Sequence, residues 1–246
     1  RKSCATNLLE TYEILCEAVE KGECIDVIYT DFSKAFDTVP HERLLLKLRA
    51  YGIQGKLHEW VRDWLTSRWQ RVVLDGHESE QLRVRSGVPQ GSVLGPLLFL
   101  IYINDLPSEL HNPMRLYADD SKILARVQSQ DDYEALQADI DAATGWTNKW
   151  LLRFNVEKCK TMHVGRGKKK STHEYSMCDV NGNRRILETT QLERDLGVLV
   201  ADDLRLGEQC RAAASKARWK FGALKQVFSS RSPLLWKILW TTHIRP

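Results

Sequence analysis

The sequence lacks several features that define other classes of protein. Its six cysteines form no CxxC pair, and no signal-like pattern precedes the first helical segment. Scattered thiols without a secretory signal indicate a reducing compartment, so we expect an intracellular protein that is not secreted. The longest apolar run, residues 93–103, is too short to span a bilayer and contains Pro96, so we expect no membrane partner.

Zinc-binding patterns are also scarce. Cys159 and His163 stand at a spacing that a zinc site can use, but no second Cys/His pair has knuckle spacing. We interpret both as ordinary strand residues. The chain has no internal repeat, and its only dense charge run is residues 166–170, which we expect in a solvated loop, with contact to nucleic-acid phosphates as the alternative.

Composition indicates an ordinary globular protein. The 246 residues are 43% hydrophobic and 28% charged, which is enough apolar surface for a real core. The net charge of +4 tolerates a polyanionic partner without requiring one. Because the chain lacks an initiator methionine, we expect a fragment of a longer protein.

Helical and strand patterns alternate along the chain. The apolar strand pattern of residues 25–32 places Val27, Tyr29 and Asp31 on one face. Asp75-Gly76 predicts a hairpin turn, and a second hairpin is expected with strands at 114–118 and 122–127 and the turn at 119–121. Four helices are read from their apolar stripes, at residues 8–19, 41–51, 57–65 and 131–151. The pattern predicts an α/β (α+β) fold with a largely antiparallel sheet packed on helices.

Several side chains within these elements carry more specific expectations. Asp131 and Glu134 are interpreted as a capping box, and Leu151 as part of that helix's inner face. The Trp60/Trp64 stripe is interpreted as core. A long helix through residues 210–228 carries an apolar stripe, and its basic side is a candidate for contacting a nucleic-acid backbone, through Arg211, Arg218 and Lys225.

Three carboxylates stand out by their position. Asp31 lies in the most apolar strand, and Asp119-Asp120 lie at the tip of an apolar hairpin. Burying carboxylates beside apolar strands costs free energy unless they are hydrogen-bonded or hold cations. Magnesium prefers one or two carboxylates completed by phosphates and water. Taken alone, Asp-Asp in a hairpin is more often simple turn chemistry.

Longer motifs make the chain resemble reverse transcriptases. Residues 31–37 (DFSKAFD) resemble motif A, residues 86–96 (SGVPQGSVLGP) motif B, residues 117–120 (YADD) motif C and residues 154–160 (FNVEKCK) motif D. Leu196-Gly197-Val198 resembles the primer-grip turn. The linking phrases at residues 70–73 and 99–106 resemble non-LTR, LINE-type retrotransposons of the jockey kind. Order and spacing agree over nearly the whole chain.

The resemblance implies a role for each motif residue. Asp31 and Asp119 would bind two Mg²⁺ ions, which Mn²⁺ can replace, with Asp120 as the supporting acid and the carbonyl of Phe32 as a further ligand. Phe36 would be the steric gate against a 2′-hydroxyl. Gln90 and Gly91 would contact the nucleotide and template.

Lys158 would be the general acid for pyrophosphate. For Phe36 the alternative is a core aromatic, for Gln90 and Gly91 a structural turn, and for Lys158 a surface lysine.

The implied protein is an RNA-directed DNA polymerase with a right-hand palm, partial fingers and the beginning of a thumb. We expect residues 1–200 to form the fingers and palm core and residues 201–246 to begin the helical thumb. Its partners would be an RNA template, a DNA primer and deoxynucleoside triphosphates, in the nucleus or cytoplasm. The endonuclease and the remaining thumb are expected elsewhere in a parent polyprotein.

Two alternatives stay open at the level of sequence. The chain is either an active polymerase or a catalytically idle nucleic-acid-binding remnant of a retroelement. A related RNA-directed RNA polymerase would use the same arrangement of metal-binding carboxylates in its palm, although Phe36 argues against ribonucleotide use. A group II intron maturase fits the linking phrases less well.

Overall fold

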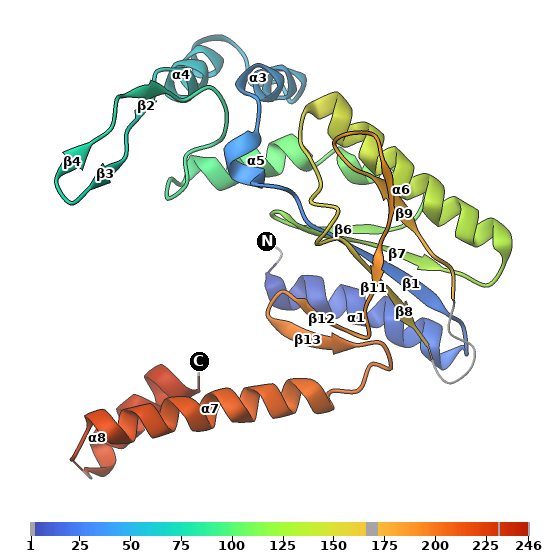
Figure 1. Cartoon of the computed structure of the whole chain (residues 1–246), viewed down its shortest axis with the longest axis vertical. Helices are drawn as coiled ribbons and strands as arrows, with labels where there is room; N and C mark the ends of the chain where they lie inside the picture. Colours follow the sequence, from blue (N-terminus) through green and yellow to red (C-terminus); the bar gives the residue numbers. More distant parts are fainter. Residues whose placement is uncertain (1–2, 166–171, 231, 246) are drawn as a thin grey trace. The chain divides into compact units, whose positions relative to one another are not determined.

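The computed structural model describes residues 3–165, 172–230 and 232–245. The charge run at 166–170 therefore lies outside the described residues. The chain forms two compact units, Arg1–Thr190 and Gln191–Pro246. The expected division into residues 1–200 and 201–246 stays a prediction. Elements are labelled in Figure 1, and each unit is described by itself.

The first unit is built around a five-stranded sheet in the order β11-β8-β1-β7-β6. The central strand β1 (Ile25–Thr30) runs antiparallel to β7 (Asp120–Arg126) and to β8 (Lys160–Val164). The edges are β6 (Met114–Tyr117) and β11 (Glu188–Thr189), the latter parallel to β8. Mixed helices and sheet of this kind confirm the predicted fold class.

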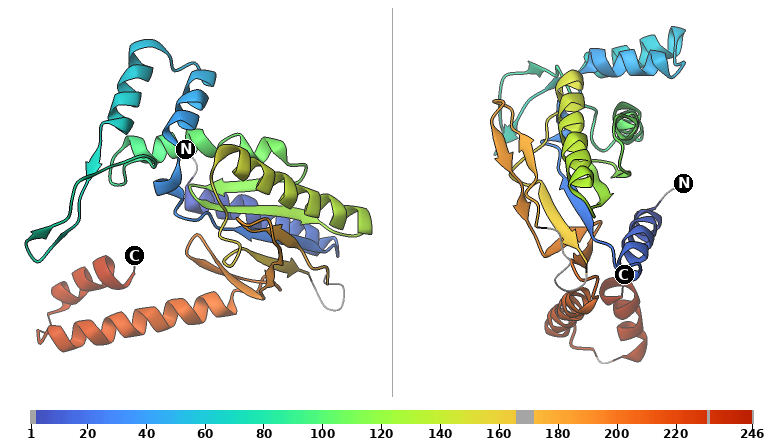
Figure 2. Two further views of the ribbon diagram at one scale, coloured as in Figure 1. Left: turned by 45° about the horizontal axis from the view of Figure 1, so that its top comes forward. Right: turned by 90° about the vertical axis from the view of Figure 1, so that its right-hand side faces the viewer.

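Helices shelter both faces of the sheet. All four residues from Ile25 to Ile28 are completely buried, so neither face of β1 meets solvent. Helix α1 (Cys4–Glu20) contacts β1 and β6, while α6 (Gln130–Trp150) contacts β7. Figures 1 and 2 show both helices running alongside the sheet.

A helical layer and an arm complete the region around motifs A and B. The helices are α2 (Ala35–Thr38), α3 (His41–Ala50), α4 (Gly55–Thr66), α5 (Leu94–Ile103) and the short 3₁₀ turn η1 (Leu106–Glu109). The arm is a hairpin of β2 (Trp69–Gln70), β3 (Val73–Leu74), β4 (His77–Glu78) and β5 (Leu82–Arg83). It turns at Asp75-Gly76 as predicted, with positive φ at both residues. The views of Figure 2 show the arm extending away from the sheet.

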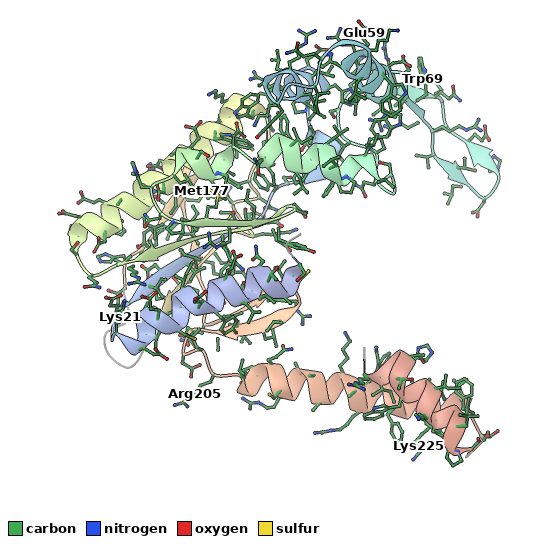
Figure 3. All side chains as sticks on the ribbon, turned by 180° about the vertical axis from the view of Figure 1, so that it is seen from behind. Lys21, Glu59, Trp69, Met177, Arg205 and Lys225 are labelled. Atoms are coloured by element: carbon green, nitrogen blue, oxygen red, sulfur yellow. The ribbon has the colours of Figure 1, made fainter. Side chains whose placement is uncertain are left out.

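A further small hairpin packs on α6. It is formed by β9 (Ser176–Cys178) and β10 (Arg184–Ile186), with a turn at residues 179–183 between them. Met177 of β9 is fully buried (Figure 3).

The second unit has a hairpin and three helical segments. Strands β12 (Leu192–Asp195) and β13 (Val198–Ala201) turn at Leu196-Gly197, both with positive φ. Helices α7 (Gly207–Val227) and α8 (Pro233–Leu239) follow, and a π-helical turn covers Trp240–Ile244. The predicted long helix is confirmed, but none of its residues is buried. On this helix Lys225, labelled in Figure 3, is in cation–π contact with Phe221.

Three predictions about single side chains were wrong. The capping box of α6 is Ser129 with Asp132, because Ser129 accepts from the Asp132 amide while the Asp132 carboxylate accepts from the Ser129 amide. Leu151 adopts the left-handed cap conformation after α6 and is exposed. Trp60 is 52% exposed, since Val61 and Leu65 take the buried face of α4, and only Trp64 packs against the core.

No described helix is long and apolar enough to cross a membrane.

Candidate active site

The end of β1 meets the tip of the β6–β7 hairpin. Thr30, the last residue of β1, faces Ser121 of β7. Their hydroxyl oxygens are 2.5 Å apart, and the Thr30 hydroxyl also lies 3.2 Å from the Ser121 carbonyl oxygen. Facing Cα atoms of antiparallel strands are roughly 5 Å apart. Asp31 and Asp120, each one residue beyond this pair, are therefore neighbours across the strands.

The hairpin turn is shorter than predicted. Tyr117 pairs with Asp120, so the turn consists of Ala118 and Asp119, and Ala118 takes a positive φ of 52°. The prediction of a turn at residues 119–121 was wrong because Ser121 is drawn into the ladder by Thr30 and Leu116. Asp119 thus occupies the outermost position of the hairpin, half-buried, next to the exposed Asp120.

Helix α1 supports this hairpin from its edge. The amide of Asn7, 3% exposed, donates to the carbonyl of Leu116 in β6 at 3.1 Å. Arg115 and Glu10 approach to 3.6 Å on the same side. Asn7 was not among the predicted site residues. The apolar stripe of its helix does not indicate that a polar side chain donates a hydrogen bond to an edge strand of the sheet.

The motif D segment holds Asp31 from the other side. The Asn155 amide donates to the Asp31 carbonyl at 2.7 Å, and the Ser33 amide donates to the Arg153 carbonyl at 2.8 Å. The rings of Phe32 and Phe154 stack with centroids 4.7 Å apart. As a result Lys158 lies close to the carboxylate, with 3.5 Å between Nζ and Oδ2 of Asp31. The structure therefore brings Lys158, whose side chain is 68% exposed, close to Asp31, and its role as general acid stays a prediction.

Cys159 and His163 are engaged in the interior instead of presenting a zinc site. Burial raises the pKa of the Cys159 thiol to about 11, although a hydrogen bond with the Asp31 backbone acts in the opposite direction. A protonated thiol is a poor metal ligand. His163 lies in β8, where its Nδ1 is 2.8 Å from the buried Asp26 carboxylate.

Motifs A and B are joined through backbone contacts. The Val88 amide donates to the Phe36 carbonyl and the Gly87 amide to the Val39 carbonyl, both at 2.8 Å. Gly87 has φ +87°, and a Cβ there would lie 2.7 Å from the Asp37 carbonyl oxygen. No residue with a side chain fits this crossing without displacing one motif.

Phe36 is half-buried in this corner. Its ring stacks on Phe99 of α5 with centroids 4.5 Å apart and planes at 25°. The ring is thus fixed from below, while part of it stays accessible. Beyond it, Gln90 is exposed and donates to Asp37 at 2.9 Å, and Gly91 takes a positive φ of 78°.

The carbonyl of Gly87 anchors motif B to two further elements. Arg68 donates to it at 2.8 Å and His41, at the start of α3, lies 3.0 Å away through Nε2. Burial is the largest cause that lowers the pKa of His41, and the Arg68 charge acts in the same direction. A neutral His41 donating to the carbonyl follows. Neither residue had been singled out from sequence.

The acidic residues fit a metal site in which the substrate supplies some of the ligands better than a site formed by protein ligands alone. Among the described residues no three His, Cys, Asp or Glu side chains gather closely enough to hold a metal by themselves. Magnesium in nucleotide-handling sites is held by one or two carboxylates, with phosphates and waters supplying the rest. Asp31 at the end of β1 and the Asp119-Asp120 tip supply carboxylates of that kind.

Comparison with known proteins decides the family. The family model described as reverse transcriptase (RNA-dependent DNA polymerase) matches residues 3–196. The chain belongs to the reverse transcriptase family. Motifs A to D, residues 31–37, 86–96, 117–120 and 154–160, lie within the matched region.

The similar polymerases come from non-LTR retrotransposons. The RNA-directed DNA polymerase from mobile element jockey of Drosophila melanogaster is 28% identical over 229 residues, covering 89% of this chain and 24% of that protein. Its counterpart in Drosophila funebris is 29% identical with the same coverage. The chain thus spans about a quarter of the length of these relatives.

Solved telomerase structures share the fold. Apo telomerase from Candida tropicalis superimposes with a TM-score of 0.55, covering 82% of this chain and 36% of that one, at 12% identity. At such low identity the likeness concerns the fold alone, which is that of a right-hand polymerase.

Proposed function

We propose that this chain is the catalytic core of an RNA-directed DNA polymerase that extends a DNA primer on an RNA template. The observation that carries the proposal is the pairing of Thr30 with Ser121, which sets Asp31 beside the Asp119-Asp120 tip. In a reverse transcriptase these are the carboxylates of motifs A and C. Their neighbourhood is what two-metal nucleotidyl transfer needs.

Asp31 and Asp119 would hold two Mg²⁺ ions, or Mn²⁺ in their place, with Asp120 and the Phe32 carbonyl in support. When bound, such ions activate the primer 3′-hydroxyl and stabilise the charge on the leaving pyrophosphate. The ammonium group of Lys158 lies 3.5 Å from the Asp31 carboxylate. With substrate bound, it would give a proton to the departing pyrophosphate oxygen.

Selection of deoxynucleotides would come from exclusion by Phe36. A flat ring held against Phe99 cannot retreat without losing its packing, so a 2′-hydroxyl above it meets a fixed wall. Gln90 and Gly91 would line the opposite part of the nucleotide position. Gly91 has no Cβ and takes a positive φ, so a ligand can approach its backbone closely.

The natural setting follows from the relatives as part of the same proposal. The substrates would be an RNA template, a DNA primer and deoxynucleoside triphosphates. None of the six cysteines, all of them among the described residues, forms a disulfide, which is in keeping with an intracellular, nuclear or cytoplasmic, site of action. Basic side chains on α7, Arg211, Arg218 and Lys225, are proposed to follow the duplex backbone. An endonuclease and the rest of the thumb, elsewhere in a parent polyprotein, stay predictions.

Primer extension on an RNA template tests the proposal, comparing the wild-type chain with Asp119→Asn. The amide keeps the shape of the carboxylate but removes its charge. We expect magnesium-dependent extension by the wild type and a loss of at least about 100-fold in the variant, the scale of one transition-state stabilising group. Equal extension by the two proteins would exclude the metal role of Asp119. Salt-sensitive duplex binding without any extension would instead identify an idle remnant.

A further inference from the structure

Asp37 lies where the segment after motif A crosses motif B, and its position is fixed through its backbone. Its carbonyl accepts from the Ser86 hydroxyl at 2.9 Å, and the Cα of Gly87 packs directly against it. The carbonyls of Phe36 and Val39 on either side accept from the amides of residues 88 and 87. These contacts fix the backbone of Asp37, while its side chain is exposed.

From that place the carboxylate reaches Gln90. The Nε2 of Gln90 donates to Oδ1 of Asp37 at 2.9 Å. An ionised carboxylate only accepts hydrogen bonds, so the partner must be the amide nitrogen of Gln90 and not its oxygen. This bond sets which way the amide is turned. The Oε1 of Gln90 is then left to face a ligand as an acceptor.

We propose that Asp37 is a positioning residue that orders the Gln90 amide for nucleotide binding. The inference rests on the proposed polymerase function and deepens it. A free glutamine side chain samples many rotamers, and immobilising it on binding costs free energy. A charge-assisted bond formed before the nucleotide arrives lowers that cost. Because Asp37 adjoins Phe36, the gate and the ordered amide belong to one rigid corner.

The expected effect of losing Asp37 is on binding, not on chemistry. Asp37→Ala should raise the KM for deoxynucleotides about three- to tenfold with little change in kcat, the scale of fixing one flexible side chain. Asp37→Asn should restore a KM close to wild type, because its side-chain oxygen still accepts from Gln90. Glu59→Ala, which removes an exposed negative charge from α4 (Figure 3), is the matched control and should leave KM unchanged.

A double-mutant cycle separates positioning from general damage. KM is measured for Asp37→Ala, Gln90→Ala and the double variant in primer extension with the whole chain. If Asp37 acts through Gln90, it adds nothing once Gln90 is gone, so the double variant should match Gln90→Ala. Independent, multiplying effects on KM would overturn the proposal, and so would an unchanged KM in Asp37→Ala.

A second readout does not depend on activity. In ¹H–¹⁵N spectra, the Gln90 side-chain amide is the signal lost in Gln90→Ala. It should shift and sharpen towards free glutamine in Asp37→Ala and keep its place in Asp37→Asn. An unmoved signal in Asp37→Ala contradicts the contact itself. If the Gln90 signal moves in Asp37→Ala but the wild-type chain extends no primer, the contact holds while the polymerase function is contradicted, and the role of Asp37 in nucleotide binding falls with that function.

Discussion

Thr30 and Ser121 face each other across β1 and β7 with their hydroxyl oxygens 2.5 Å apart, immediately before Asp31 and immediately after Asp120. Both residues are only 5% exposed. This buried pair fixes the register between β1 and β7, two strands that are far apart in the sequence. The relative position of the proposed catalytic carboxylates follows from it.

Thr30→Val should therefore weaken the fold as well as the site. The substitution keeps the shape but leaves the buried Ser121 hydroxyl with one partner fewer, which costs about 1–2 kcal/mol. Urea unfolding measures the change. Thr66→Val is the control, since that hydroxyl bonds only a carbonyl of its own helix. Equal stability of Thr30→Val and wild type would contradict the structural role of the pair.

Phe36→Ala should relax the selection against ribonucleotides. Removing the ring opens space beneath the sugar, so the ratio of kcat/KM for ribonucleotides to deoxynucleotides should rise at least about tenfold. Single-nucleotide incorporation on an RNA template measures the ratio. Trp60→Ala removes an exposed aromatic remote from the motifs and should leave it unchanged. A ratio that stays at the wild-type value in Phe36→Ala would contradict the proposal that Phe36 excludes the 2′-hydroxyl.

Gly87→Ala should decrease the free energy of unfolding, and Gly145→Ala should increase it. At Gly87 a methyl group would meet the Asp37 backbone at 2.7 Å with φ at +87°, so a loss of at least about 2 kcal/mol is expected. Gly145 lies inside α6 with open space around its Cβ direction, and alanine there should stabilise by roughly 0.5–1 kcal/mol. Thermal unfolding of the two variants decides. A neutral Gly87→Ala would show that motifs A and B do not cross as closely as described.

Stability should fall in mild acid because of His41. Burial lowers the pKa of this imidazole in the folded chain below its ordinary value of 6.5. The unfolded chain then binds the proton more readily, so the contribution is complete above pH 6.5 and is lost as pH decreases below it. His41→Gln, which keeps a donor for the Gly87 carbonyl, should flatten this part of the stability profile between pH 7 and 5. The same slope in both proteins would assign the acid sensitivity to other groups.

The motif residues could be placed from sequence because each motif is a local pattern. Period-two alternation located β1, and Asp75-Gly76 located the arm's turn, since both depend on neighbouring residues alone. The register between β1 and β7 is different. It depends on a contact between residues 91 positions apart, so the sequence predicted the hairpin but placed its turn at residues 119–121 instead of 118–119.

Supporting residues were harder to predict for the same reason. Asn7, Arg68 and Asp37 act through carbonyls or side chains of distant segments, and no spacing rule marks them. The prediction that Trp60 is a core residue was wrong, because an apolar stripe on a helix does not show how wide the buried face of that helix is. The capping box of α6 began two residues earlier than expected, as Ser129 competes with Asp131 for the same role.

The most direct test is to locate divalent ions in crystals of the chain with an RNA–DNA primer-template, a deoxynucleotide and Mn²⁺. Anomalous scattering identifies manganese without ambiguity. We expect manganese to bridge the carboxylates of Asp31 and Asp119 beside the nucleotide phosphates. A bound nucleotide with manganese elsewhere, or with those two carboxylates too far apart to share an ion, would contradict it.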